Sequence, residues 1–284
     1  MADETAIKPL ELLLKCSVIS PYINVDRSFS VIIIADSQLY KTGSLMKFSD
    51  VRGITVQTDI TYRDFVNEVL SDIQRGKYNT IIIPDLLKAI RKKQSTKENF
   101  LTLMNALIEE GVYKVYSGKD FEGARANLLT SITPDVWKDN RKGWHKIGFM
   151  NRLIPFTFEY TDERSKAVYE AIGKYAIDRN EKIEVNLPLI NKIDVEIQKK
   201  YTDFAEECSK NTAKSEGYFR YYRQKDGELN AKFFGEKHAF RHKWHFQTIL
   251  KCLAVIRGDI KVNGEDIKTL EWMSKWINYD FNPL

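Results

Sequence analysis

Hydrophobic positions in the first 160 residues gather in short runs, separated by longer amphipathic segments. Five of these runs are rich in Ile, Val, Leu, Thr and Phe, and they span residues 30–34, 54–58, 80–83, 128–133 and 154–160. Short apolar runs of this kind are typical of strands that are buried on both faces of a sheet. Segments with helical periodicity lie between them, for example at 62–74 and 99–110. The alternation predicts a doubly wound α/β domain with a parallel five-stranded sheet.

The pattern changes near residue 162. Further along the chain we find no comparable strand runs, and helical periodicity dominates to about Trp276. We therefore expect two domains, an α/β core over residues 1–162 and a helical domain over residues 163–284. Within the core, two short extended pieces around Ser117-Gly118 predict a β-hairpin before the fourth strand.

The composition indicates the class of protein and its compartment, but it does not indicate a function. The 284 residues are 43% hydrophobic and 29% charged, which is ordinary for a globular protein. No apolar run approaches the length of a membrane span, and the N-terminus lacks the layout of a signal peptide, so we expect a cytoplasmic protein with no membrane partner. Three widely spaced cysteines with no CxxC pair fit a reducing compartment. The net charge of +5 permits nucleic acid as a partner without requiring it.

The segment "ADSQLYKT" follows the first predicted strand and places Lys41 and Thr42 at the start of a helix. A phosphate loop binds through backbone N–H groups at a helix start, with a Lys on the β and γ oxygens and a Ser or Thr on Mg²⁺. The glycines of that pattern are missing, because Ala35 and Tyr40 stand in their places. Asp36 and Tyr40 could crowd the phosphates, so this motif alone supports a nucleotide site and an ordinary turn equally.

Polar residues also stand beside three other predicted strands. Pro84 and Asp85 follow the third strand, where a hydrolytic phosphate-loop protein places an Asp for magnesium and commonly a Glu for water. Proline binds no metal, so either Asp85 performs one of these tasks or both are weakened. Thr133 ends the fourth strand, and Arg152 comes just before the fifth. Each of these positions, taken singly, also fits an ordinary strand end.

In chain order, these features resemble the series found in AAA+ ATPases: phosphate loop, acidic strand, polar sensor strand, arginine finger and helical lid. The lid segment "FRHKWHFQTILKCLAVIRGDIKVNGEDI" resembles the branch that contains the MCM helicases and the MoxR ATPases. Arg241, Arg257 and "VNGEDI" fall where that branch has its helix-opening Arg, its closing basic residue and a similar turn. "ADSQLYKTGSL" and "FMNRLIPFTF" are similar to the phosphate loop and arginine-finger segments of MCM proteins.

The resemblance implies an AAA+ αβα core with an α-helical lid, and ATP with Mg²⁺ at a subunit interface. Residues on the nucleotide would be Asp36, Tyr40, Lys41 and Thr42. Lys41 would hold the γ-phosphate, Thr42 and Asp85 would serve the metal, and Asp85 would lie nearest the hydrolytic water. Thr133 stands in the sensor position, and Arg152 would reach a neighbouring subunit's site. Arg241 would report the nucleotide state to the lid, and in MCM-type rings this residue also acts on a neighbour.

The resemblance implies that the protein acts on DNA, as a helicase, loader or remodeller in replication or mobile-element biology. The expected assembly is a ring or filament, possibly with a catalytically complete AAA+ partner. The expected DNA contacts are Lys114, Lys119 and Arg125 at the tip of the hairpin and, in the aromatic and basic segment "EGYFRYYRQKDG", Arg220 and Arg223. The alternative for each of these segments is a solvated loop.

Two other classes remain open. Missing glycines and Pro84 favour a catalytically degenerate AAA+ subunit that serves as a DNA-binding or assembly scaffold. The retained Lys41, Thr42, Asp85, Arg152 and Arg241 favour a weak or partner-dependent ATPase. A nucleotide-binding α/β protein of another family would need neither an oligomer nor Arg152. Three histidines (His238, His242 and His245) share one helix face, but Arg241 beside them opposes a metal cation.

Overall fold

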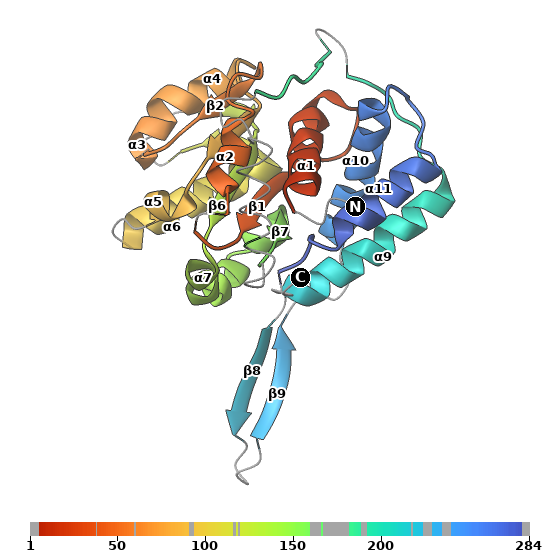
Figure 1. Cartoon of the computed structure of the whole chain (residues 1–284). Coiled ribbons are helices and arrows are strands. Elements are labelled where there is room, and N and C mark those ends of the chain that lie inside the picture. The colour runs from red at the N-terminus through yellow and green to blue at the C-terminus, as the bar shows by residue number, and fades with distance from the viewer. Residues whose placement is uncertain are drawn as a thin grey trace.

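The computed structural model of the chain describes residues 6–37, 39–59, 61–90, 94–115, 118, 120–159, 166, 182–188, 192–216, 218–223, 229–234 and 240–279. Figure 1 shows a body of sheet and helices from which one hairpin projects. Within the described residues, no helix combines the length and apolar character required to cross a bilayer. The three cysteines are free thiols in buried positions.

The core is a five-stranded sheet in which every neighbouring pair is parallel. Its strand order is β2-β3-β6-β1-β7. The strands are β1 (Ser30–Ile34), β2 (Ile54–Val56), β3 (Thr80–Ile83), β6 (Asn127–Ile132) and β7 (Leu153–Thr157). The prediction of an α/β fold with a parallel five-stranded sheet is therefore confirmed. The order places β6 between β1 and β3, so the end of β6 lies between the ends of those two strands.

Helices cover both faces of the sheet, because alternate side chains of each strand point to opposite sides. Ile33 of β1 packs in one hydrophobic cluster and Ile32 in the other. The helices of this half are α1 (Ile7–Ile19), α2 (Lys41–Met46), α3 (Tyr62–Asp64), α4 (Leu70–Gln74), α5 (Leu86–Ile90), α6 (Gln94–Asn105) and α7 (Pro134–Lys146). A π-helical turn (Phe65–Val69) joins α3 to α4, and a second (Ala106–Glu110) follows α6.

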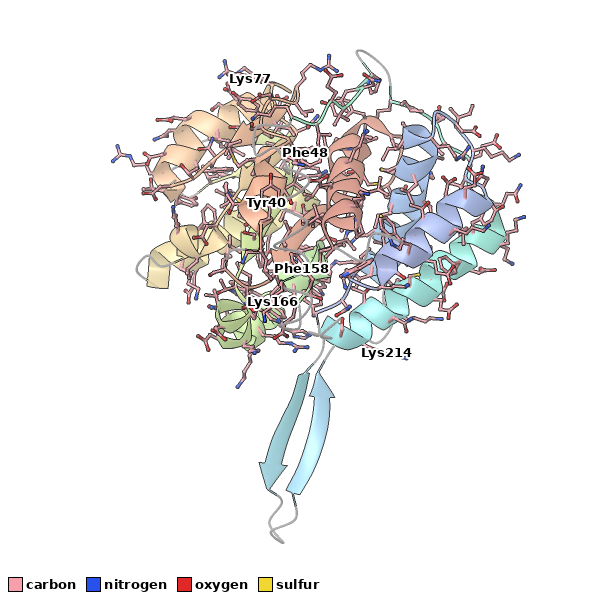
Figure 2. The ribbon with its side chains drawn as sticks, viewed as in Figure 1. Tyr40, Phe48, Lys77, Phe158, Lys166 and Lys214 are labelled. Atoms are coloured by element: carbon pink, nitrogen blue, oxygen red, sulfur yellow. The ribbon has the colours of Figure 1, made fainter. Side chains whose placement is uncertain are left out.

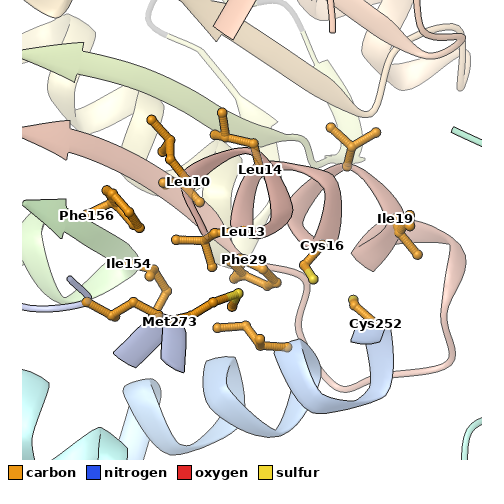
Figure 3. Close-up of a cluster of buried hydrophobic side chains, with 14 of the residues drawn as sticks. Leu10, Leu13, Leu14, Cys16, Ile19, Phe29, Ile154, Phe156, Cys252 and Met273 are labelled. Atoms are coloured by element: carbon orange, nitrogen blue, oxygen red, sulfur yellow. The ribbon is translucent and has the colours of Figure 1, made fainter. Parts of the chain in front are cut away.

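In the described part of the second half, the helices with assigned bounds are α9 (Lys199–Glu216), α10 (Phe240–Ile256) and α11 (Gly264–Ser274). Helix α1 lies between them and the sheet, and its residues Leu10, Leu13 and Cys16 share a buried cluster with Ile154 of β7 and Met273 of α11. Figure 3 shows this packing. Sheet and helical half therefore share one continuous hydrophobic core.

One expectation for the second half is wrong. The segment expected to be free of strands contains an antiparallel hairpin, β8 (Tyr218–Arg223) and β9 (Leu229–Phe234), between α9 and α10. Four of the six residues of β8 are aromatic, and aromatic residues favour strands. Since aromatic residues stand at both odd and even positions of this segment, the sequence lacks the apolar and polar alternation that marks a half-buried strand. Figure 1 shows the hairpin projecting from the body.

The hairpin expected around Gly118 is present. It consists of β4 (Val112–Lys114) and β5 (Asp120–Ala124), which pair antiparallel. Gly118 lies in the turn at φ +81°, a conformation that glycine adopts without steric cost.

Asn127 ties α1 to the start of β6 through buried polar contacts. Its amide nitrogen donates to the Ser17 carbonyl at 2.8 Å and to the Ser20 hydroxyl at 3.0 Å, and its amide oxygen accepts from the Ser28 hydroxyl at 2.7 Å. Asn127 is 1% exposed. Because water cannot replace these partners, the three contacts fix how α1 meets the amino edge of the sheet.

Replacing Asn127 with Ala should lower the free energy of unfolding by about 3 kcal/mol, since each of three buried hydrogen bonds contributes about 1 kcal/mol. Asn24→Ala is the matched control, because Asn24 is exposed and its amide contacts a single carboxylate, that of Asp194. Urea unfolding followed by circular dichroism measures both variants. A loss at Asn127 no larger than that at Asn24 would contradict this role.

Candidate functional site

Three residues expected at the nucleotide site lie at the carboxyl edge of the sheet. Lys41 opens α2 after β1, Asp85 follows β3 and Thr133 follows β6. Because β6 pairs with both β1 and β3, these three positions lie at one edge of three adjacent strands. In open α/β sheets, ligands collect outside this edge.

The loop into α2 takes the backbone conformation that a glycine usually provides. Tyr40 has φ 59° and ψ 17°, and it is the only non-glycine residue with positive φ in the described part of the chain. The left-handed conformation costs an ordinary residue roughly 1–2 kcal/mol. Its ring lies against the first turn of α2, where a Cβ added to Gly43 would be 2.4 Å from a ring carbon. Figure 2 shows Tyr40 beside this helix.

The Lys41 side chain folds back under the loop. Its ammonium donates to the Asp36 carbonyl oxygen at 2.8 Å and also to the carbonyl oxygen of Ala35. The residue is 9% exposed. Burial lowers the pKa of the Lys41 ammonium to about 8, against the opposing effect of the carboxylates of Asp36 and Asp85. A partly desolvated cation beneath a strained loop is a setting that favours an incoming anion.

The other residues expected here have less specific surroundings. Thr42 and the Asp36 side chain are exposed, so both are accessible to a ligand. Asp85 accepts a hydrogen bond from the Leu87 backbone N–H at 3.0 Å through one carboxylate oxygen, as a helix-capping residue does. Thr133 is the N-cap residue of α7, and its side chain makes no capping hydrogen bond.

The expected arginine finger, Arg152, and the residue expected to report the nucleotide state, Arg241, lie at the opposite edge of the sheet. Arg152 precedes β7, and Arg241 lies in the first turn of α10. Both contact the carboxylate of Glu109, at 2.7 Å from Arg152 Nε and 2.8 Å from Arg241 Nε. Arg27 pairs with the same carboxylate. Arg152 also contacts Glu110 at 2.6 Å and the Gly148 carbonyl oxygen at 2.6 Å.

Strands of three to six residues separate the two edges, and at about 3.3 Å per residue most span roughly 13–20 Å. Arg241 lies with Arg152 and not with Lys41, so it is not placed to contact a phosphate held by Lys41 of the same chain. Both arginines face a ligand only if that ligand reaches the amino edge of the sheet.

The residues expected on DNA are scattered. Lys114 ends β4 and is exposed, with the Asp120 carboxylate 4.0 Å from its ammonium. Arg220 and Arg223 belong to the projecting strand β8. Lys119 lies outside the described residues.

The placement of Arg125 at the tip of the hairpin is wrong. Arg125 directly follows β5, and its guanidinium donates to the Glu110 carbonyl oxygen at 3.0 Å, so it lies at the base of the hairpin beside the amino edge of the sheet.

Of the three histidines expected on one helix face, His242 and His245 are described, and both lie buried in α10. His242 and His245 have ring centroids 6.0 Å apart. Burial, with the neighbouring His242, Arg27 and Arg241, holds the pKa of His245 well below its usual value. The described residues contain no group of three His, Cys, Asp or Glu side chains that could hold a metal. His238 is not among the described residues.

Arg27 and Glu109 are the residues of this edge that sequence reasoning missed. "NALIEEG" predicts only a helix end, and Arg27 stands alone in "NVDRSF". Their contact joins positions 82 residues apart, and the contact of Glu109 with Arg241 joins positions 132 residues apart. No local spacing could have indicated them.

Glu109→Gln should lower the free energy of unfolding by on the order of 3 kcal/mol, because it removes the carboxylate shared by three guanidinium groups. Glu109 is 8% exposed as a side chain, whereas Glu110 is 58% exposed. The matched variant Glu110→Gln should therefore change the free energy of unfolding by less than about 1 kcal/mol. Urea unfolding compares the two. Equal effects would show that Glu109 does not organise this edge.

Comparison with known proteins does not assign the chain to a family. A scan against protein-family models finds no match, and neither does a search of curated proteins. The function proposed for the chain rests on its own residues and their arrangement.

Proposed function

We propose that the chain is an AAA+-type module that binds ATP at the loop of residues 35–42 and acts on DNA as part of an oligomer. The observation that carries the proposal is the conformation of Tyr40. A tyrosine held in the left-handed region, at the position where a phosphate loop has glycine, keeps the shape of such a loop despite its cost. Backbone strain of this kind concentrates at ligand-binding sites.

The residues at this edge fit the triphosphate in charge and position. Lys41 offers an ammonium that is already held at the base of the loop by two carbonyl oxygens. One ammonium hydrogen remains for a phosphate oxygen, because Lys carries three donors. The Tyr40 side chain does not cap α2, and backbone N–H groups at a helix start favour an anion.

The fit for Mg²⁺ is narrower. Magnesium usually takes one or two protein ligands and completes its shell with phosphate oxygens and water. Thr42 has an exposed hydroxyl, and Asp85 offers the carboxylate oxygen that does not cap α5. The metal would offset charge on the phosphates. Asp85 would then either hold it or orient a water molecule, because Pro84 provides no ligand.

Hydrolysis would depend on a second copy or a partner. Arg152 and Arg241 lie together at the amino edge, where they can reach a nucleotide only across an interface. A guanidinium brought to the transferred phosphoryl would offset charge that develops in the transition state. Arg152 would first have to exchange the carboxylates of Glu109 and Glu110 for phosphate oxygens, which favours slow or partner-dependent turnover.

The scaffold alternative has an observation of its own. Three arginines already share the Glu109 carboxylate within one chain, so their charge serves the fold without any nucleotide. Under this alternative, the exposed Lys114 and the projecting β8–β9 hairpin would still contact DNA or another subunit.

Replacing Lys41 with Ala should abolish ATP binding, measured by isothermal titration with Mg²⁺ present. Tyr40→Gly is the informative companion variant, since glycine adopts the same backbone conformation without strain and leaves more room. ATP should therefore bind to it at least as tightly as to the parent protein.

The affinity for ATP should also depend on pH. Because the pKa of Lys41 is about 8, the affinity should fall about tenfold between pH 7 and pH 9, as the ammonium loses its proton. Retained binding by Lys41→Ala would remove this loop as the site.

Mixing two inactive variants tests hydrolysis across an interface. Arg152→Ala and Lys41→Ala should each lose at least tenfold in ATP turnover, since arginine fingers contribute roughly 10³–10⁵ in complete sites. Their mixture should recover part of the turnover, because an intact Lys41 on one chain can meet an intact Arg152 on another. If the parent oligomer shows no turnover above background, the scaffold alternative is the correct one.

A further inference from the structure

A cleft of about 170 Å³ lies at the amino edge of the sheet, on the opposite side from the Lys41 loop. Segments that precede three different strands meet there: residues 20–28 before β1, Asn79 before β3, and Arg125 with Ala126 before β6. Among the charged residues that line it are Arg27, Arg125, Lys192, Asp26 and Glu109. The cleft is therefore formed where segments that lead into three strands meet the helical turn that carries Glu109, so it does not rest on one surface loop alone.

The local charge is positive. Arg27, Arg125 and Lys192 line the cleft together with Asp26 and Glu109, and Arg152 and Arg241 contact the Glu109 carboxylate. Counting Glu110 as well, five cationic side chains surround three carboxylates. One of those carboxylates, Glu109, is shared by three guanidinium groups, so it cannot neutralise them all.

Arg27 is fixed by contacts with two neighbouring side chains. Its guanidinium lies over the Trp244 ring at 4.6 Å from the centroid and pairs with Glu109 on one side. The side chain is still 35% exposed. Burial and the neighbouring Arg241, Arg125 and Arg152 lower the pKa of Arg27, which reports crowding of like charge that an anion would relieve.

We propose that this cleft binds a small phosphate-bearing anion, with Arg27, Arg125 and Lys192 as the residues that contact it. Arginine suits phosphate because its planar fork can donate two parallel hydrogen bonds. The cleft is smaller than the roughly 300–1,000 Å³ typical of pockets for drug-sized ligands. It therefore suits inorganic phosphate, pyrophosphate, or the terminal phosphates of a longer ligand, and it needs no contribution from Lys41.

The test is isothermal titration of the Lys41→Ala protein with pyrophosphate, so that the phosphate-loop site does not contribute. In that background, Arg125→Gln with Lys192→Gln should weaken binding at least tenfold, because two of the three cations that face the anion are lost. The control is Arg63→Gln with Lys268→Gln, which changes the net charge equally at two exposed positions on α3 and α11. The control should leave the affinity within about twofold.

Several outcomes would overturn the cleft site. The first is that both double variants weaken pyrophosphate binding equally. The second is that the parent protein binds pyrophosphate but Lys41→Ala does not. The third is that neither of these two proteins binds pyrophosphate. The second outcome would place the anion at the Lys41 loop, so it would leave the proposed nucleotide site standing. Displacement of pyrophosphate by short single-stranded DNA but not by ATP would also contradict a small-anion site.

Discussion

Parallel pairing of five short strands divides this molecule into two chemically different edges. Because all five strands run in the same direction, residues that follow strands lie at the carboxyl edge of the sheet. Residues that precede strands lie at the amino edge. Lys41, Asp85 and Thr133 share the first edge, and Arg27, Arg125 and Arg152 share the second. A nucleotide at one edge can meet the arginines only if another chain presents its own amino edge. The proposed dependence on an oligomer follows from this separation.

The helical half is joined to the sheet through α1 and so shares in this arrangement. Leucines of α1 pack with helices α10 and α11 and with β7 in one hydrophobic cluster, and Arg241 of α10 reaches the Glu109 carboxylate. A movement of α10 would therefore shift a guanidinium at the amino edge. In the proposed oligomer, this coupling would give a physical route from the state of a neighbouring subunit to α10, without any contact between Arg241 and a nucleotide in its own chain.

Patterns within single segments predicted the strands, the β4–β5 hairpin and the strand-to-helix turn at Lys41, because local periodicity and turn residues determine them. The sequence does not predict the β8–β9 hairpin, because aromatic residues at consecutive positions of β8 give no alternation of apolar and polar residues. The expected position of Arg125 at the hairpin tip is wrong, because the charge of a residue near a turn does not show how far the following strand extends. Strand β5 ends at Ala124, so Arg125 lies at the base of the hairpin. Arg27 and Glu109 could not be found, because their contacts join distant parts of the chain. The strain at Tyr40 is visible only in the backbone.

The claim that ATP occupies the Lys41 loop is tested most directly by amide hydrogen exchange with and without Mg²⁺–ATP. This measurement locates binding on the chain without requiring hydrolysis. The account predicts slower exchange at the amides of residues 39–44, where the start of α2 would meet the phosphates, with smaller changes after β3. Slower exchange confined to the segments around Arg27 and Arg125, with the loop unchanged, would contradict it.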